Sequence, residues 1–144
     1  MRLILLSLSS AFALQGLACA ATLSDAEKAQ IIEKVCPSAH EIEEIDPLRL
    51  QILKGVVVVK EPDGSPQGLP DAVVHLTRMG SRRNESGHYS SRTAQDGSFS
   101  VEAAPDGRYR LTVCKEGFVT LNTTVALSRK ANQRSVVLTT RLDW

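Results

Sequence analysis

The sequence predicts an all-β protein, a sandwich of about seven antiparallel strands in Greek-key order with an N-terminal helix in front. The stretch from Ser91 to Phe118 predicts three short strands, and the second and third alternate apolar and polar residues with the period of a half-buried strand. Two tight-turn signals, Asp96-Gly97 and Pro105-Asp106-Gly107, separate these runs. Four further runs rich in β-branched residues complete the set, because such residues favour strands.

The other predicted strands lie on both sides of this central unit. Four consecutive valines end at Val59 and suit a strand, because β-branched side chains crowd a helix. The next stretch, Glu61 to Asp71, carries three prolines and two glycines and is predicted to be a loop. A second strand is predicted from Ala72 to Arg78, with Val74 and Leu76 facing the core. The last two predicted strands span residues 119–127 and 135–142.

Residues 1–20 predict a cleaved signal peptide rather than part of the fold. Arg2 supplies the positive start, Leu3 to Leu14 is apolar, and Ala18-Cys19-Ala20 is a small-residue cleavage site. The apolar run is too short for a membrane-spanning helix. A lipoprotein acylated at Cys19 is the alternative, which Gly16 disfavours because leucine is usual at its position. We therefore expect a secreted or periplasmic protein with no membrane span.

The charge of the mature chain is balanced. Without Arg2, 16 basic residues (17 − 1) face 16 acidic ones, which argues against nucleic acid or an anionic membrane as the partner. The sequence contains no phosphate-binding loop, no dinucleotide fingerprint and no G-x-S-x-G motif. We therefore predict no enzyme activity, no catalytic residue and no cofactor.

Residues 21–50 predict a helix followed by an acidic connector, and residues 51–144 the sandwich. The helix runs from Leu23 to Cys36, where Ser24 and Glu27 have the spacing of a capping box and Pro37 ends the helix. The connector, residues 38–47, repeats the capping spacing and allows another helical turn.

The long polar stretch from Met79 to Ser90 is the preferred recognition segment. It is longer than a usual hairpin loop, and long loops on rigid sandwiches often bind partners. A solvated loop without a role is the competing interpretation. The candidate binding surface consists of Arg82, Arg83, His88, Tyr89 and Trp144.

The order of these motifs resembles the carboxypeptidase regulatory-like domain, a transthyretin-like (prealbumin-like) sandwich. The resemblance rests on four stretches: residues 71–76, 93–99, 105–111 and Gly117-Phe118. It covers roughly residues 52–142. The sequence departs from the family pattern where Asp71 replaces glycine, Ala94 replaces aspartate, and Asp106 is inserted after the proline. The resemblance implies a non-catalytic accessory module with a carbohydrate-binding-like fold.

The mature chain has two cysteines, Cys36 and Cys114. An even pair in an exported protein favours a disulfide, which would tie the predicted helix to the outward face of a strand. Such a bridge would close a loop of 79 residues. Two separate thiols are the alternative.

One short motif suggests a metal site but is weak. His40 and Glu43 have the H-x-x-E spacing that zinc carboxypeptidases use for two ligands. Catalytic zinc needs a third protein ligand, and the motif stands in a glutamate-rich connector where it arises easily by chance. No metal site is predicted.

The predicted function is an exported, non-catalytic binding or accessory module whose partner is a carbohydrate, a protein or a peptide. The alternative is a structural subunit of an envelope complex without a small-molecule ligand. The oligomeric state and the use of the sequons at Asn84 and Asn122 stay open.

Overall fold

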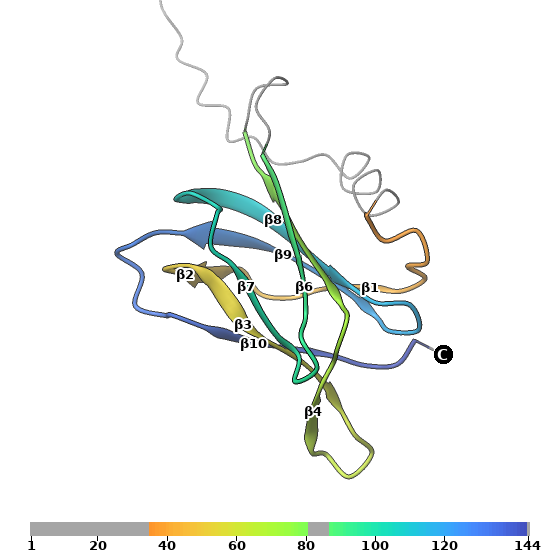
Figure 1. The fold of residues 1–144 in the computed structure, drawn as a ribbon. Helices are drawn as coiled ribbons and strands as arrows, with labels where there is room; N and C mark the ends of the chain where they lie inside the picture. Colours follow the sequence, from red (N-terminus) through yellow and green to blue (C-terminus); the bar gives the residue numbers. More distant parts are fainter. Residues whose placement is uncertain (1–34, 81–86, 144) are drawn as a thin grey trace, which may run out of the picture.

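The computed structural model describes residues 35–80 and 87–143, which form an all-β sandwich of two sheets (Figure 1). The predicted signal peptide and nearly all of the helix predicted from Leu23 lie outside the described residues. Within them the chain forms ten strands: β1 (Ile42–Glu44), β2 (Leu48–Leu50), β3 (Leu53–Lys60), β4 (Pro66–Gly68), β5 (Val73–Arg78), β6 (His88–Arg92), β7 (Ser98–Val101), β8 (Gly107–Cys114), β9 (Thr120–Leu127) and β10 (Val136–Thr140).

The larger sheet has the order β1-β9-β8-β5-β6, with β2 also pairing with β9. Its centre is antiparallel, because β8 pairs with β5 on one side and β9 on the other. The short strands β1 and β2 run parallel to β9, one beside each half of it. The N-terminal part of the described chain is attached to this sheet through β1 and β2.

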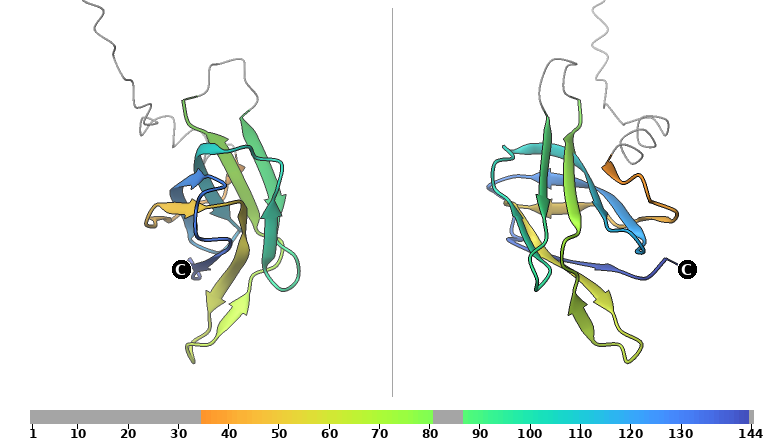
Figure 2. Two further views of the ribbon diagram at one scale, coloured as in Figure 1. Left: turned by 90° about the vertical axis from the view of Figure 1, so that its left-hand side faces the viewer. Right: turned by 45° about the vertical axis from the view of Figure 1, so that its right-hand side comes forward.

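The smaller sheet is built around β3. Strand β10 runs parallel to β3 on one side, and β4 and β7 run antiparallel to it on the other. The β3–β4 hairpin projects beyond the rest of the sandwich (Figure 2). Both sheets are therefore mixed, and the expectation of a purely antiparallel sandwich is wrong. The Greek-key order stays a prediction.

All seven strands expected from the sequence are present, as β3 and β5 to β10, and three more strands of three residues each join them. Strands β1 and β2 stand where an acidic connector was expected, so the additional helical turn is wrong. Strand β4 lies in the predicted loop, and His88 to Ser90 belong to β6 instead of the polar loop. These short segments have no periodic pattern of their own. They become extended because neighbouring strands offer partners for their backbone groups, as in the hydrogen bond from Thr120 N–H to the carbonyl oxygen of Glu41.

The core lies between the sheets and consists almost entirely of aliphatic residues. As expected, Val74 and Leu76 point inward and are fully buried. Strand β8 differs from its predicted alternation, because its residues 109–114 are buried on both faces of the sheet. The segment before β1 covers part of the outer face of the large sheet. The alternating pattern of β8 alone does not predict this cover.

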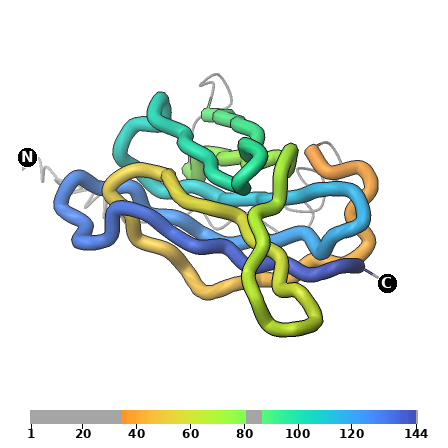
Figure 3. Tube along the Cα trace, turned by 60° about the horizontal axis from the view of Figure 1, so that its bottom comes forward, coloured from red at the N-terminus to blue at the C-terminus, as the bar shows by residue number. Residues whose placement is uncertain are grey.

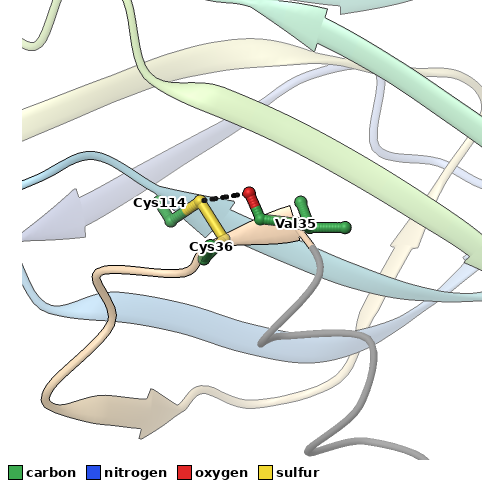
Figure 4. The surroundings of a disulfide bond; sticks show 3 residues. All are labelled: Val35, Cys36 and Cys114. Carbon is green, nitrogen blue, oxygen red and sulfur yellow. Dashed lines mark hydrogen bonds between the residues drawn. A yellow bond between two sulfur atoms is a disulfide. The ribbon is translucent and has the colours of Figure 1, made fainter.

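The predicted disulfide joins this segment to the sheet. Cys36 and Cys114 are bonded, with their Cα atoms 6.1 Å apart, and both are buried (Figure 4). Val35, Ala39 and Val73 pack around the bridge, and the carbonyl oxygen of Val35 lies 3.9 Å from the Cys114 sulfur. The bridge therefore attaches the chain before β1 to the outer face of β8.

The hairpin motif of residues 93–99 is explained by two contacts. The Thr93 hydroxyl donates to the Leu69 carbonyl at 2.6 Å and accepts from the Ala72 N–H at 2.8 Å, which ties two loops together in the interior. Gly97 has a φ of 81°, and a Cβ there would lie 2.3 Å from the carbonyl oxygen of Val57. Glycine is therefore required at this position by both conformation and space.

Gly97→Ala is expected to destabilise the protein by several kcal/mol, because it adds a clash with the β3 backbone to the cost of a left-handed alanine. Gly64→Ala is the matched control, since Gly64 has a φ of 84° and a Cβ added there would meet no atom within 4 Å. The control should cost only about 1–2 kcal/mol, the cost of the left-handed conformation alone. Urea unfolding of both variants measures the difference, and equal losses would contradict the steric argument.

Replacing Cys36 and Cys114 by serine is expected to lower the free energy of unfolding by about 4 kcal/mol, because the unfolded chain loses a long covalent loop. The measurement is urea unfolding of the double variant against the wild type. Thiol titration of the denatured wild-type protein without reductant is the control and should find no free thiol at these positions. Two titratable thiols there would contradict the bridge.

The Tyr109 phenol is a buried group whose ionisation affects stability. Its hydroxyl donates to the Pro105 carbonyl at 2.6 Å, and burial is the main cause that raises its pKa above 10.0. A raised pKa means that the folded state prefers the protonated phenol. This contribution to stability is complete below pH 10 and is lost as the pH rises through the higher pKa of the folded state.

Tyr109→Phe is expected to cost about 1 kcal/mol at pH 7, because the ring still packs but the hydrogen bond is lost. The difference from wild type should shrink above pH 10, where wild type must ionise a buried phenol. Urea unfolding at both pH values tests this, with Tyr89→Phe as the control for the neighbouring ring. A difference that does not change with pH would show that the Tyr109 hydroxyl is not the titrating group.

Candidate binding surface

The outer face of the large sheet is polar and partly covered. Its strand registers place His75 beside Thr112 and Thr112 beside Asn122, and Asn122 lies next to Glu44 of β1. Asn122 donates its amide to the Glu44 carboxylate at 3.1 Å, and the guanidinium of Arg110 pairs with the same carboxylate. Because the Arg110 side chain is only 7% exposed, this ion pair holds β1 in place more than it offers a ligand site.

The H-x-x-E motif lies away from any gathered set of ligands. His40 and Glu43 are both exposed, Glu43 on β1. Among residues 35–80 and 87–143, no group of three His, Cys, Asp or Glu side chains is placed to hold a metal ion. The described part of the chain also contains no helix long and apolar enough to cross a membrane.

Two of the five predicted surface residues are described, and both lie on β6. His88 is exposed on the outer face, where its ring stacks on that of His75 at 5.6 Å and its Nδ1 lies 3.5 Å from the Thr77 hydroxyl. Tyr89 is partly buried, and its ring meets Tyr109 edge-on at 6.0 Å. Its ring is therefore part of the packing and is no open platform. Arg82, Arg83 and Trp144 lie outside the described residues.

A groove of about 580 Å³ lies over the small sheet, and sequence reasoning did not find it. It crosses β7, the first half of β3 and the start of β10, and Arg92 of β6 also lines it. A volume of this size is within the usual range for small-ligand sites. The groove is thus on the same side of the molecule as the β6–β7 connection and adjoins the strand that carries His88.

The groove combines hydrogen-bonding groups with a small apolar surface. Its charged side chains are Lys54, Arg92 and Glu102, all exposed. Hydroxyls come from Ser98, Ser100 and Ser135. Val56 and Val137 provide the apolar part, and Val137 is 65% exposed. Such a surface can donate and accept several hydrogen bonds beside a hydrocarbon patch.

The groups of this groove are already partly oriented. Ser98 donates its hydroxyl to Asp96 at 2.6 Å, and this bond is the first cause that lowers the pKa of the Asp96 carboxyl. Arg92 pairs with Asp71 at 3.0 Å, with both side chains well exposed. A weak sequence signal was present, because Ser98 and Ser100 occupy the outward positions of a strand whose inward positions are Phe99 and Val101. The contribution of β10 could not be read from that pattern.

The comparisons with known proteins identify a family. The model of the carboxypeptidase regulatory-like domain matches residues 52–141. The comparison with curated proteins finds no significant match.

The solved structures that resemble the chain include the following two. One is 3-chlorocatechol 1,2-dioxygenase from Rhodococcus opacus, with 16% identity, 74% of this chain and 68% of that chain covered, and a TM-score of 0.45. The other is a Pseudomonas aeruginosa protein that has been proposed to bind carbohydrate, with 14% identity, coverages of 74% and 95%, and a TM-score of 0.43. At these scores neither likeness bears on function.

The family match covers well over half of the chain and includes the turn, the hairpin and the closing Gly117-Phe118 on which the resemblance was based. The chain therefore belongs to the carboxypeptidase regulatory-like domain family.

Proposed function

We propose that this chain is an exported, non-catalytic binding module that holds a carbohydrate in the groove over the small sheet. The predicted signal peptide supports export, and the Cys36–Cys114 bridge is compatible with an oxidising compartment. The family supports an accessory role. The fold itself hosts many functions, so the ligand class has to come from the groove.

The composition of the groove is the observation that carries the proposal. Sugar hydroxyls both donate and accept hydrogen bonds, and Glu102, Arg92 and the serine hydroxyls offer partners of both kinds. The apolar face of a pyranose ring needs a hydrocarbon surface, which Val56 and Val137 provide. His88 stays proposed as a further part of the binding surface, as do Arg82, Arg83 and Trp144, which lie outside the described residues.

A protein partner is the second candidate, and strand β10 favours it. This strand lies at the edge of the small sheet, since within the described residues it pairs only with β3. Its outward residue Val137 is the most exposed large hydrophobic side chain of the described part. An open edge with an exposed valine can accept a strand from another protein. In that case the chain would be a structural subunit of an envelope complex.

The test is retention of the mature chain, Ala21 to Trp144, on immobilised polysaccharides, with native envelope extract run in parallel. We expect saturable retention on a polysaccharide. Glu102→Gln should weaken it by roughly tenfold, because a charged hydrogen bond is lost without a change in size. Glu43→Gln is the matched control, since Glu43 is exposed on β1 outside the groove, and it should bind like wild type.

Two results would separate the candidates. Retention of one defined protein, abolished by Val137→Arg, together with no polysaccharide binding, would establish the edge-strand alternative. Polysaccharide binding that is equally affected by Glu102→Gln and Glu43→Gln would place the ligand elsewhere and remove the groove from the proposal.

A further inference from the structure

A second groove, of about 530 Å³, lies at the other end of β3. Three segments that are distant in the sequence line it: the β3–β4 hairpin with the residues up to Pro70, the turn that holds Lys115 and Phe118, and the C-terminal residues Arg141 and Leu142. The projecting hairpin and the chain after β10 lie side by side in this region (Figure 3). The two grooves share no lining residue.

The floor of the second groove is apolar and partly open to solvent. Phe118 and Leu142 are bridged to each other as strand partners, and Leu142 is 42% exposed. Val59 and Leu69 continue the apolar surface from the hairpin side. An exposed leucine beside a phenylalanine is an incompletely buried apolar surface, and covering it would be favourable.

Lys115 brings a positioned cation into this surface. Its Nζ donates to the Pro70 carbonyl at 2.7 Å and lies 6.0 Å from the centroid of the Phe118 ring. An ammonium group has three donors, and the carbonyl uses one of them. No carboxylate of the described residues pairs with Lys115, so the remaining donors can meet an anion.

The rim of the groove is positive overall. Lys60 and Arg141 join Lys115, whereas Glu61 is the one acidic residue among those that line the groove. Arg141 pairs with Glu41, which leaves the two lysines as the groups available to a ligand. Cationic side chains therefore outnumber acidic ones among the lining residues by three to one.

Strand-like segments line the groove, and an extended chain can lie along them. One wall is the β3–β4 pair, and the other is the antiparallel contact of residues 117–119 with residues 141–143. In an extended peptide, successive side chains point to opposite sides. A segment that alternates apolar and acidic residues can therefore place apolar groups on the floor and carboxylates toward the lysines.

We propose that the groove between the β3–β4 hairpin and the C-terminal residues binds an extended acidic segment of a partner protein, with its carboxylates at Lys115 and Lys60 and its apolar side chains on Phe118 and Leu142. Charge complementarity identifies the partner: the cations lie beside an apolar floor, so a ligand needs both an anionic and an apolar part. This site is separate from the carbohydrate groove, and it can be correct or wrong independently of it.

The probe is a fluorescein-labelled octapeptide that alternates valine and aspartate, titrated with the mature chain and followed by fluorescence anisotropy. We expect saturable binding that weakens as salt is raised, because the contacts include exposed charges. The same peptide with asparagine in place of aspartate should bind more weakly, and the lysine version should not bind. Equal binding of the aspartate and asparagine peptides would overturn the proposal.

Variants locate the site. Lys60→Ala should lower the affinity by roughly two- to fivefold, the range of one exposed ion pair. Lys130→Ala is the matched control, an exposed lysine outside the groove, and should leave affinity unchanged. Leu142→Asp should abolish binding, because it puts a carboxylate on the apolar floor. Lys60 and Lys130 are both exposed, so neither alanine variant is expected to affect folding.

One further variant keeps the two grooves apart. Glu102→Gln, in the groove over the small sheet, should leave peptide affinity unchanged whether or not a polysaccharide binds there. Loss of peptide binding in Glu102→Gln would contradict a peptide site in the second groove. Equal losses of affinity in Lys60→Ala and Lys130→Ala would contradict it as well.

Discussion

The structure depends on β8, the strand whose residues from Tyr109 to Cys114 are buried on both faces. On the inner side Tyr109, Leu111 and Val113 meet the core between the sheets. On the outer side lie Arg110, Thr112 and Cys114, which are also excluded from water. A strand buried on both faces needs cover on both, and polar side chains on one of them need partners there.

The N-terminal part of the described chain provides much of that cover. Its side chains are suitable partners for the residues on the outer face of the large sheet. Cys36 bonds to Cys114, and Glu44 receives both the Arg110 guanidinium and the Asn122 amide. Ile45 N–H donates to the Asn122 carbonyl, which extends the sheet through β1. An acidic stretch thus becomes part of the large sheet because its carboxylate neutralises a buried arginine and its backbone completes the edge of β9.

Both candidate ligand sites lie along β3, at its two ends. The first half of β3 is flanked by β7 and β10 and carries the polar groove, whereas its second half pairs with β4 and carries the apolar, cationic groove. The rigid pairing of β3 keeps the two sites a fixed distance apart. Under the two proposals above, a glycan would lie at one end of β3 and a protein segment at the other.

The sequence by itself determined the seven main strands and the turns between them, and it favoured the pairing of Cys36 with Cys114 over two separate thiols. The strands and turns have local causes, namely alternation along a strand and positive φ at Gly97, and the cysteine pairing follows the even number of cysteines after the predicted signal peptide. The family departure at Asp71 also has a local reason, because this residue has a φ of 56°, a conformation that glycine adopts freely and aspartate tolerates.

Only the tertiary structure decided which short segments became strands and where ligands could bind. Strands β1, β2 and β4 have three residues each, which is too few for a hydrophobic period to be recognised. They form because the neighbouring strands have backbone N–H and C=O groups that need hydrogen-bond partners. The parallel pairing of β10 with β3 joins residues about 80 positions apart, which no local pattern encodes. The second groove has a similar origin: Lys60 ends β3 of the small sheet, Lys115 follows β8 of the large sheet and Leu142 follows β10, so only the packing of the two sheets brings these residues to one groove.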